Sequence, residues 1–208
     1  MIMKSFIFDL DGTLINSYKG ITNSILNILK KENINESFDS IYEYIIRTSV
    51  VDYLNYVSKK YNIDKDSLKE DYKNERVNSI NDYKLMPNCS NLIVELYKRG
   101  DNLFIFTHKG ESTYKVLDDN NLSKYFKCVI DSSSPNFKRK PDPYSLSYII
   151  DKYNLDINNT YYVGDRKIDV ESAKNANVKS ILYRSSSVNI KCDFDYEIYN
   201  LIEILDIK

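Results

Sequence analysis

Several residue types are scarce in this chain, among them the cysteines that cross-link small secreted proteins. Its 208 residues include three cysteines, four prolines, five glycines, one histidine and no tryptophan. The cysteines, Cys89, Cys128 and Cys192, are far apart and odd in number, which fits neither a disulfide framework nor a zinc-binding spacing. We therefore expect ordinary thiols in a reducing compartment, and we place the protein in the cytoplasm.

Long apolar segments and an excess of one charge are also missing. The N-terminal apolar run is interrupted by Asp9 and is too short for a signal peptide or a membrane span. The formal net charge is −1, so no global field attracts nucleic acid or an anionic membrane. No apolar stripe is left over for pairing with a second copy. We expect a soluble monomer that binds neither nucleic acid nor membranes.

Strand-like and helix-like segments alternate over most of the chain. The predicted strands are short runs of apolar, β-branched and aromatic residues, at Ser5–Leu10, Asn102–Thr107, Lys127–Asp131, Thr160–Val163 and Lys179–Tyr183. The predicted helices between them are Asn88–Arg99, Glu111–Asn120, Asp142–Tyr153 and Ile168–Asn175. This alternation predicts an α/β fold built on a doubly wound parallel sheet.

One long segment breaks the alternation, because no strand pattern occurs between about residues 17 and 83. Helical spacing or composition there indicates helices at Tyr18–Lys31, Tyr42–Tyr61 and Lys65–Ile80. We therefore expect a small α-helical domain, residues 16–83, inserted after the first strand. The α/β core domain is then formed by residues 1–15 and 84–208.

Two carboxylates follow the first predicted strand. Asp9 and Asp11 stand two residues apart, directly before a Gly12-Thr13 turn. Burying such charges costs several kcal/mol unless they are paired or bound to a metal. A divalent cation is the simplest ligand for them.

Polar groups also lie at the ends of the later strands, where open α/β sheets bind their ligands. They belong to Thr107-His108-Lys109-Gly110, Lys138-Arg139-Lys140 and Gly164-Asp165-Arg166-Lys167-Ile168-Asp169. Asp9, Asp11 and Asp165 together would repel a phosphate dianion, since one like-charge pair at 4 Å costs about 4 kcal/mol at an effective dielectric near 20. Magnesium removes that repulsion, and the Lys140 ammonium favours ionised Asp9. The sequence thus predicts a site for magnesium and phosphate together.

The motifs resemble those of the haloacid dehalogenase-like (HAD) phosphohydrolases, in order and across the whole core. The matching positions are Asp9-Leu10-Asp11-Gly12-Thr13, then Thr107, then Lys140 in Lys-Pro-x-Pro, then Gly164-Asp165 with Asp169. The helical insert is similar to the cap of the phosphoglycolate-phosphatase-like subgroup. Phe8–Leu14 followed by Gly20-Ile21-Thr22-Asn23-Ser24 carries that likeness.

The resemblance implies a Mg²⁺-dependent phosphatase acting on a small phosphorylated metabolite, such as phosphoglycolate, a sugar phosphate or a nucleotide. Asp9 is then the nucleophile that forms an aspartyl-phosphate, and Asp11 is the general acid and base. The phosphate-binding groups are Thr107, Lys140 and the main-chain N–H of His108. The metal ligands are Asp9, the main-chain carbonyl of Asp11, and Asp165, with Asp169 supporting the metal shell or Lys140.

Several alternatives stay open at this point. Asp169 is also a candidate helix cap, Thr13 is expected to cap the backbone of its loop, and Arg166 has no assigned role. A phosphomutase of the same fold competes, although no histidine occurs in residues 1–107. A dehalogenase is disfavoured by Asp11, and a non-catalytic phosphate-binding protein by the intact motifs. Candidates for specificity in the insert are Asn16, Lys19, Asn23, Arg47 and Thr48.

Overall fold

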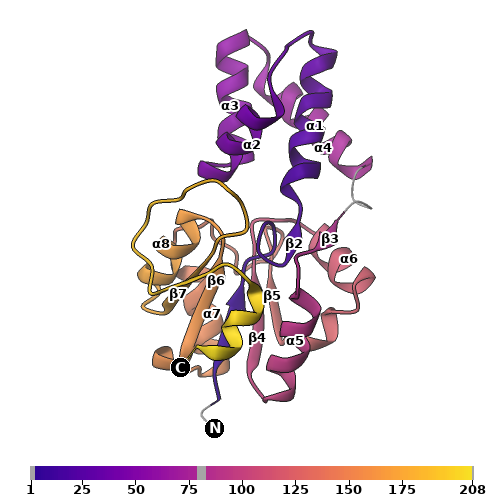
Figure 1. The fold of residues 1–208 in the computed structure, drawn as a ribbon. Helices are drawn as coiled ribbons and strands as arrows, with labels where there is room; N and C mark the ends of the chain where they lie inside the picture. The colour runs from indigo at the N-terminus through magenta and orange to yellow at the C-terminus, as the bar shows by residue number, and fades with distance from the viewer. Residues whose placement is uncertain (1–2, 79–82, 208) are drawn as a thin grey trace. The chain divides into compact units, whose positions relative to one another are not determined.

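The computed structural model describes residues 3–78 and 83–207, which form two compact units (Figure 1). The first unit comprises the described residues up to Asn16 and from Leu85 onward. The second comprises the described residues between Ser17 and Lys84. Helices within the described ranges all lack the length and apolar character that crossing a bilayer requires.

A parallel sheet forms the centre of the first unit. Its strands are ordered β5-β4-β1-β6-β7-β8, and each neighbouring pair is parallel. Their bounds are Ser5–Phe8 for β1, Asn102–Phe106 for β4, Cys128–Ile130 for β5, Thr160–Gly164 for β6, Lys179–Tyr183 for β7 and Tyr196–Ile198 for β8. The predicted doubly wound α/β fold is confirmed. The edge strand β8 of this sheet was not predicted from the sequence.

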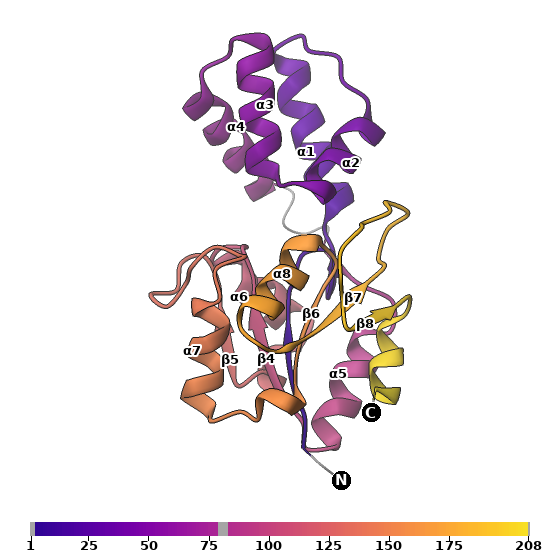
Figure 2. The same cartoon turned by 90° about the vertical axis from the view of Figure 1, so that its left-hand side faces the viewer.

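Helices cover both faces of the sheet (Figure 2). They are α5 Cys89–Lys98, α6 Ser112–Asp119, α7 Tyr144–Tyr153 and α8 Lys167–Asn175, with 3₁₀ turns η2 Ser123–Tyr125, η3 Ile157–Asn159 and η4 Leu201–Asp206. Leu146 of α7 and Ala173 of α8 pack into one core with Ile7, Phe104 and Tyr162 of the sheet. α5 and η4 lie on the opposite face. Strands buried from both sides explain the continuous apolar runs in the sequence.

The second unit contains four helices. They are α1 Tyr18–Lys31, α2 Phe38–Arg47, α3 Val50–Tyr61 and α4 Lys65–Asn78. The expected continuous helix over Tyr42–Tyr61 is wrong, because the chain leaves helical geometry at Thr48, with φ −124° and ψ −103°. Ser49 then caps α3, where its Oγ accepts a hydrogen bond of 3.0 Å from the Asp52 N–H. The predicted end of the last helix, Ile80, lies outside the described residues.

A short two-stranded ladder was also not predicted. It pairs β2, Ile15–Asn16, with β3, Lys84–Leu85, and so joins the two points where the chain enters and leaves the helical segment. Strands of two residues carry no readable period.

Asparagine takes the place that glycine often has at helix ends. Six asparagines in the described ranges have φ between 48° and 62°: Asn33, Asn62, Asn88, Asn121, Asn154 and Asn177. Asn62 and Asn154 are the C-caps of α3 and α7. Because asparagine tolerates left-handed backbone better than most residues, a chain with five glycines can still end its helices sharply.

Candidate active site

The central strand β1 delivers Asp9 to the carboxyl edge of the sheet. The Asp9 N–H donates to the Val163 carbonyl at 2.8 Å, which continues the pairing with β6 beyond Phe8. The Asp9 side chain is buried, and the residue is only 1% exposed. Its Oδ1 accepts a hydrogen bond of 2.7 Å from the Lys140 ammonium. Its Oδ2 has no hydrogen-bond partner among the described residues.

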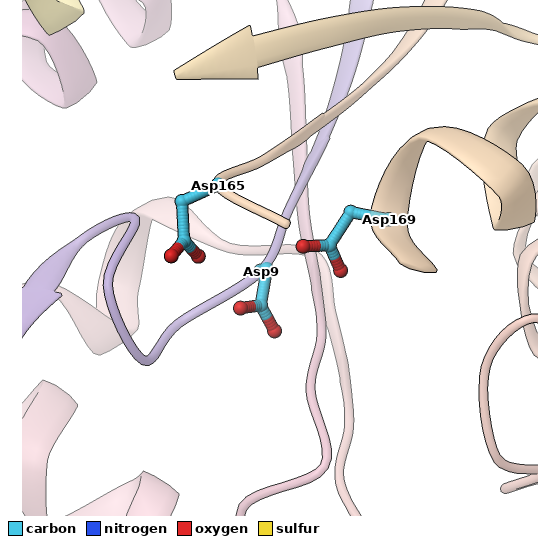
Figure 3. Close-up of side chains that lie close together, drawn as sticks. All are labelled: Asp9, Asp165 and Asp169. Atoms are coloured by element: carbon cyan, nitrogen blue, oxygen red, sulfur yellow. The ribbon is translucent and has the colours of Figure 1, made fainter. Parts of the chain in front are cut away.

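Two further carboxylates meet Asp9 at this edge (Figure 3). Asp165 follows β6, and Asp169 lies in the first turn of α8. One oxygen of each of Asp9, Asp165 and Asp169 lies within 4.8 Å of the others, and all three residues are buried. The sequence predicted the main-chain carbonyl of Asp11, not its side chain, as a metal ligand, and the Asp11 carboxylate is not one of the three in this cluster.

Lys140 is the ammonium that balances this cluster. Its side chain is fully buried, and Nζ lies 2.7 Å from both Asp9 Oδ1 and Asp169 Oδ1. The rings of Phe106 and Tyr162 each have their centroid 5.2 Å from Nζ. Cation–π contact and two charge-assisted hydrogen bonds therefore hold this one lysine in place.

The pKa values of Asp9 and Asp169 are shifted in opposite directions. Burial raises the pKa of Asp9 to about 6, Lys140 opposes that shift, and Asp169 adds to it. Burial also acts to raise the pKa of Asp169, but Lys140, Arg166 and the hydrogen bonds outweigh it and lower that pKa. Asp9 is thus the carboxylate for which the protein supplies too little positive charge.

Asp169 performs two tasks that the sequence left as alternatives. Its Oδ2 accepts the Arg166 N–H at 3.0 Å, which caps α8, while its Oδ1 accepts from Lys140. Gly164 makes room for it, because a Cβ on Gly164 would lie 2.3 Å from the Asp169 Cβ. Only glycine, which has no Cβ, leaves space at position 164 for the Asp169 side chain.

The end of β4 contributes Thr107 and His108. The Thr107 N–H donates to the Ile130 carbonyl at 2.9 Å, and its Oγ accepts from the Lys109 N–H at 3.2 Å. The His108 Nε2 accepts the Lys140 main-chain N–H at 2.8 Å. Burial and the positive charges of Lys140, Arg139 and Arg166 lower the pKa of His108 to about 2. A neutral ring engaged in this way is unsuited to act as a general base. The phosphate-binding roles of these two residues stay predictions.

Three contacts escaped sequence reasoning. Lys109 Nζ lies 3.3 Å from Asp11 Oδ1, with the lysine side chain 8% and the aspartate side chain 21% exposed. The Thr13 Oγ donates to Asp165 Oδ1 at 3.2 Å, so its side chain supports a carboxylate instead of capping its own loop. The positive charge of Arg166, which had no role in the sequence analysis, lowers the pKa of both Asp9 and Asp169. Lys109 lies in the polar segment 107–110 that the sequence indicated, but no motif or spacing identified it as a site residue.

The cluster fits a hard divalent cation. It offers carboxylate oxygens alone, which are the ligands that Mg²⁺ prefers. Asp9 Oδ2 is buried and lacks a partner in the described ranges, and the Asp9 carboxylate is short of positive charge. Asp169 is the least available ligand, because both of its oxygens already accept hydrogen bonds.

The fold and this acidic site agree with what the sequence matches among known proteins. Residues 6–183 match the haloacid dehalogenase-like hydrolase family, and the chain belongs to that family. The phosphoglycolate phosphatase of Aquifex aeolicus is 28% identical over 190 residues, covering 86% of this chain and 84% of the relative. The pyrophosphatase PpaX of Oceanobacillus iheyensis is 25% identical, covering 100% of this chain and 97% of the relative.

A solved structure extends the likeness to the fold. A Clostridium difficile protein superposes with a TM-score of 0.84 at 24% identity, covering 99% of this chain and 98% of its own. The protein described here is therefore a hydrolase of the HAD-like family, similar to proteins named phosphatases, with a six-stranded parallel sheet and a helical insertion.

Proposed function

We propose that the protein is a Mg²⁺-dependent phosphatase that hydrolyses small phosphomonoesters through an aspartyl-phosphate on Asp9. The environment of Asp9 carries this proposal. One of its oxygens is anchored by Lys140, and the other faces no donor among the described residues, within a cluster of three buried acids. An anchored, buried carboxylate of this kind is placed to act as a nucleophile.

The cation supplies charge compensation in this proposal. Asp9 and Asp165 would hold Mg²⁺ together with the main-chain carbonyl of Asp11, and the ion would offset repulsion between the acids and a phosphate dianion. We assign Asp169 to Lys140 rather than to the ion, because its two oxygens already accept from Lys140 and from the Arg166 N–H.

The residues of the chain then divide the reaction into two steps. Asp9 attacks phosphorus, the bond to the ester oxygen breaks, and Asp11 gives its proton to the leaving alkoxide. Water next attacks the phospho-aspartate, Asp11 takes a proton from that water, and phosphate and free Asp9 result. Thr107, Lys140 and the main-chain N–H of His108 hold the phosphoryl oxygens during both steps.

Phosphoglycolate is the first substrate to test, because relatives named phosphoglycolate phosphatase align over most of both chains. Pyrophosphate is the second, since the relative named pyrophosphatase aligns over the whole of this chain. We propose that the helical segment, residues 16–83, acts as a cap that selects the substrate and excludes water from a core formed by residues 1–15 and 84–208. A cytoplasmic monomer with free thiols is the form we expect.

The test is a substrate panel assayed with Mg²⁺ and with EDTA. It contains phosphoglycolate, pyrophosphate, sugar phosphates, nucleoside monophosphates and an aryl phosphate. We expect phosphate release that requires Mg²⁺ and disappears in Asp9→Asn, while that variant keeps its cooperative thermal unfolding. Undiminished turnover by Asp9→Asn rules out the mechanism.

Other outcomes of the panel point to the competing functions. A sugar-phosphate isomer formed without free phosphate indicates a mutase. Halide release from a haloacid in EDTA indicates a dehalogenase. Tight phosphate-ester binding without any turnover indicates a binding protein.

A further inference from the structure

His108 is the single histidine of the chain, and its ring is held between two parts of the first unit. Nε2 accepts the main-chain N–H of Lys140 at 2.8 Å. The rings of Phe106 and Phe137 meet the imidazole edge-on, with centroids 6.4 and 5.6 Å away. Arg139 Nη2 lies 3.5 Å from Nδ1 on the other side of the ring. The hydrogen bond at Nε2 and the two edge-on rings therefore fix the imidazole in direction as well as in place.

Accepting from an amide requires the neutral ring with its proton on Nδ1. Burial and the nearby charges of Lys140, Arg139 and Arg166 all disfavour a second proton. These effects outweigh the opposite effect of Asp169 and favour the neutral ring that accepts at Nε2. The same bond occupies Nε2, the only ring nitrogen with a free lone pair in this tautomer, so the ring cannot also accept a proton as a general base.

The partner of this bond lies in a long connection between β5 and α7. Ser145 Oγ accepts the Lys138 N–H at 2.7 Å, and Asn175 Nδ2 donates to the Pro141 carbonyl at 2.9 Å. His108 supplies the anchor at Lys140 itself. It differs from the other two anchors because it comes from the end of β4, directly after Thr107. The bond therefore ties the two predicted phosphate-binding segments to each other.

We propose that His108 is a positioning residue, whose Nε2 fixes the main chain at Lys140 and so sets where the Lys140 ammonium lies between Asp9 and Asp169. A lysine side chain has four rotatable carbon–carbon bonds, so the position of Nζ depends on where its main chain is held. The contacts of Lys140 Nζ with Asp9 and Asp169 are both 2.7 Å long, so a shift of the Lys140 main chain would disturb them. This inference rests on the proposed function, in which Lys140 orients Asp9 and the phosphoryl group.

The geometry is tested first, without any assay of activity. In ¹⁵N-labelled protein we expect a scalar coupling across the hydrogen bond between the Lys140 amide and His108 Nε2. We also expect the imidazole ¹⁵N shifts to stay constant between pH 5 and 8. A ring that titrates in this range, or an Nε2 that carries a proton, overturns the inference even if the enzyme is fully active.

Kinetics with the aryl phosphate and Mg²⁺ test the consequence. His108→Leu removes the acceptor, and we expect kcat to fall by about 10- to 100-fold while KM changes less than about threefold, as for small misplacements of catalytic groups. His108→Gln places a carbonyl near the position of Nε2, and it should recover most of the lost kcat. His108→Asn is shorter by one carbon and should not.

A matched control separates this role from general loosening of the loop. Asn175→Ala removes the anchor at Pro141, one residue further on, and should leave kcat within about threefold of the wild type if placement of Lys140 is what matters. Unchanged kcat in His108→Leu, equal losses in the Leu and Gln variants, or an equal loss in Asn175→Ala would each overturn the proposal. Failure of the proposed function itself has a different signature, since the wild type would then release no phosphate.

Discussion

The two oxygens of Asp9 have opposite surroundings, and this contrast is the main residue-scale feature of the site. Oδ1 is bound by Lys140, and Oδ2 is buried without a donor in the described ranges. One ammonium is shared with Asp169, so burial leaves the pKa of Asp9 raised to about 6. A buried carboxylate kept in this state is costly to the fold, and a bound cation would relieve that cost.

The raised pKa of Asp9 makes a prediction about stability and pH. A folded-state pKa above the ordinary value of 3.8 means that the folded protein holds this proton more tightly than the unfolded chain does, so ionisation at higher pH costs stability. In Mg²⁺-free buffer, Asp9→Asn should therefore stabilise the protein at pH 8 by about 1–3 kcal/mol, since one pKa unit equals about 1.4 kcal/mol.

The same gain should shrink at pH 5, where the wild-type carboxyl is already neutral. Chemical denaturation at both pH values measures the difference. An Asp9→Asn variant that is less stable than the wild type at pH 8, or equally more stable at both values, contradicts this description of Asp9.

Thr13 makes a second prediction at this scale. Its hydroxyl donates to Asp165 Oδ1, and groups that orient metal ligands typically contribute 10- to 100-fold to metal affinity. Thr13→Val keeps the shape and removes the donor, so its Mg²⁺ affinity, measured by calorimetric titration, should fall by about tenfold. Thr13→Ser keeps the hydroxyl and should bind like the wild type. Equal affinity in the Val variant would show that the hydroxyl does not orient Asp165.

The site residues that directly follow a strand could be predicted from the sequence. Asp9 and Asp165 follow buried strands, so their position at the sheet edge follows from the strand pattern alone. The contacts of Thr13 and Lys109 depend instead on how the backbone turns after Gly12, where φ is 84°, and after Thr107. No periodicity encodes such turns, and those contacts were missed.

At the scale of elements, the sequence predicted those with a strong pattern and missed those without one. β1 and β6 are fully buried, and their apolar runs were recognised. The break between α2 and α3 was missed because Ile45, Ile46 and Leu54 keep a helical spacing across it. The only local signal was Thr48-Ser49, whose side chains compete for backbone hydrogen bonds.

Asn154 makes the prediction that belongs to this scale. It ends α7 with φ 48° and ψ 53°, a left-handed conformation that costs most L-residues about 1–2 kcal/mol. Asn154→Gly should leave the free energy of unfolding unchanged or slightly higher, and Asn154→Ala should lower it by about 1 kcal/mol. Urea denaturation of the two variants and the wild type gives the comparison. An alanine variant as stable as the glycine variant would show that the left-handed C-cap contributes nothing.

At the scale of the whole molecule, strand order brings the chemistry together. β4, β1 and β6 are neighbours, and the residues after them are Thr107, Asp9 and Asp165. Residues far apart in the sequence thus meet at one sheet edge, as ligand sites in open α/β sheets do. The apolar residues of the helical unit, such as Ile25, Ile45 and Leu54, are buried and leave its polar residues to discriminate substrates under our proposal.

The central claim is that Asp9 and Asp165, in the buried cluster of three carboxylates, hold one divalent cation. Titration with Mn²⁺ followed by electron paramagnetic resonance tests it directly, with Asp165→Asn as the variant and the exposed Asp142→Asn as its control. We predict one Mn²⁺ per wild-type chain, displaced by Mg²⁺, with affinity reduced at least about tenfold in Asp165→Asn and unchanged in Asp142→Asn. Absence of a site in the wild type, or equal affinity in all three proteins, would contradict the claim.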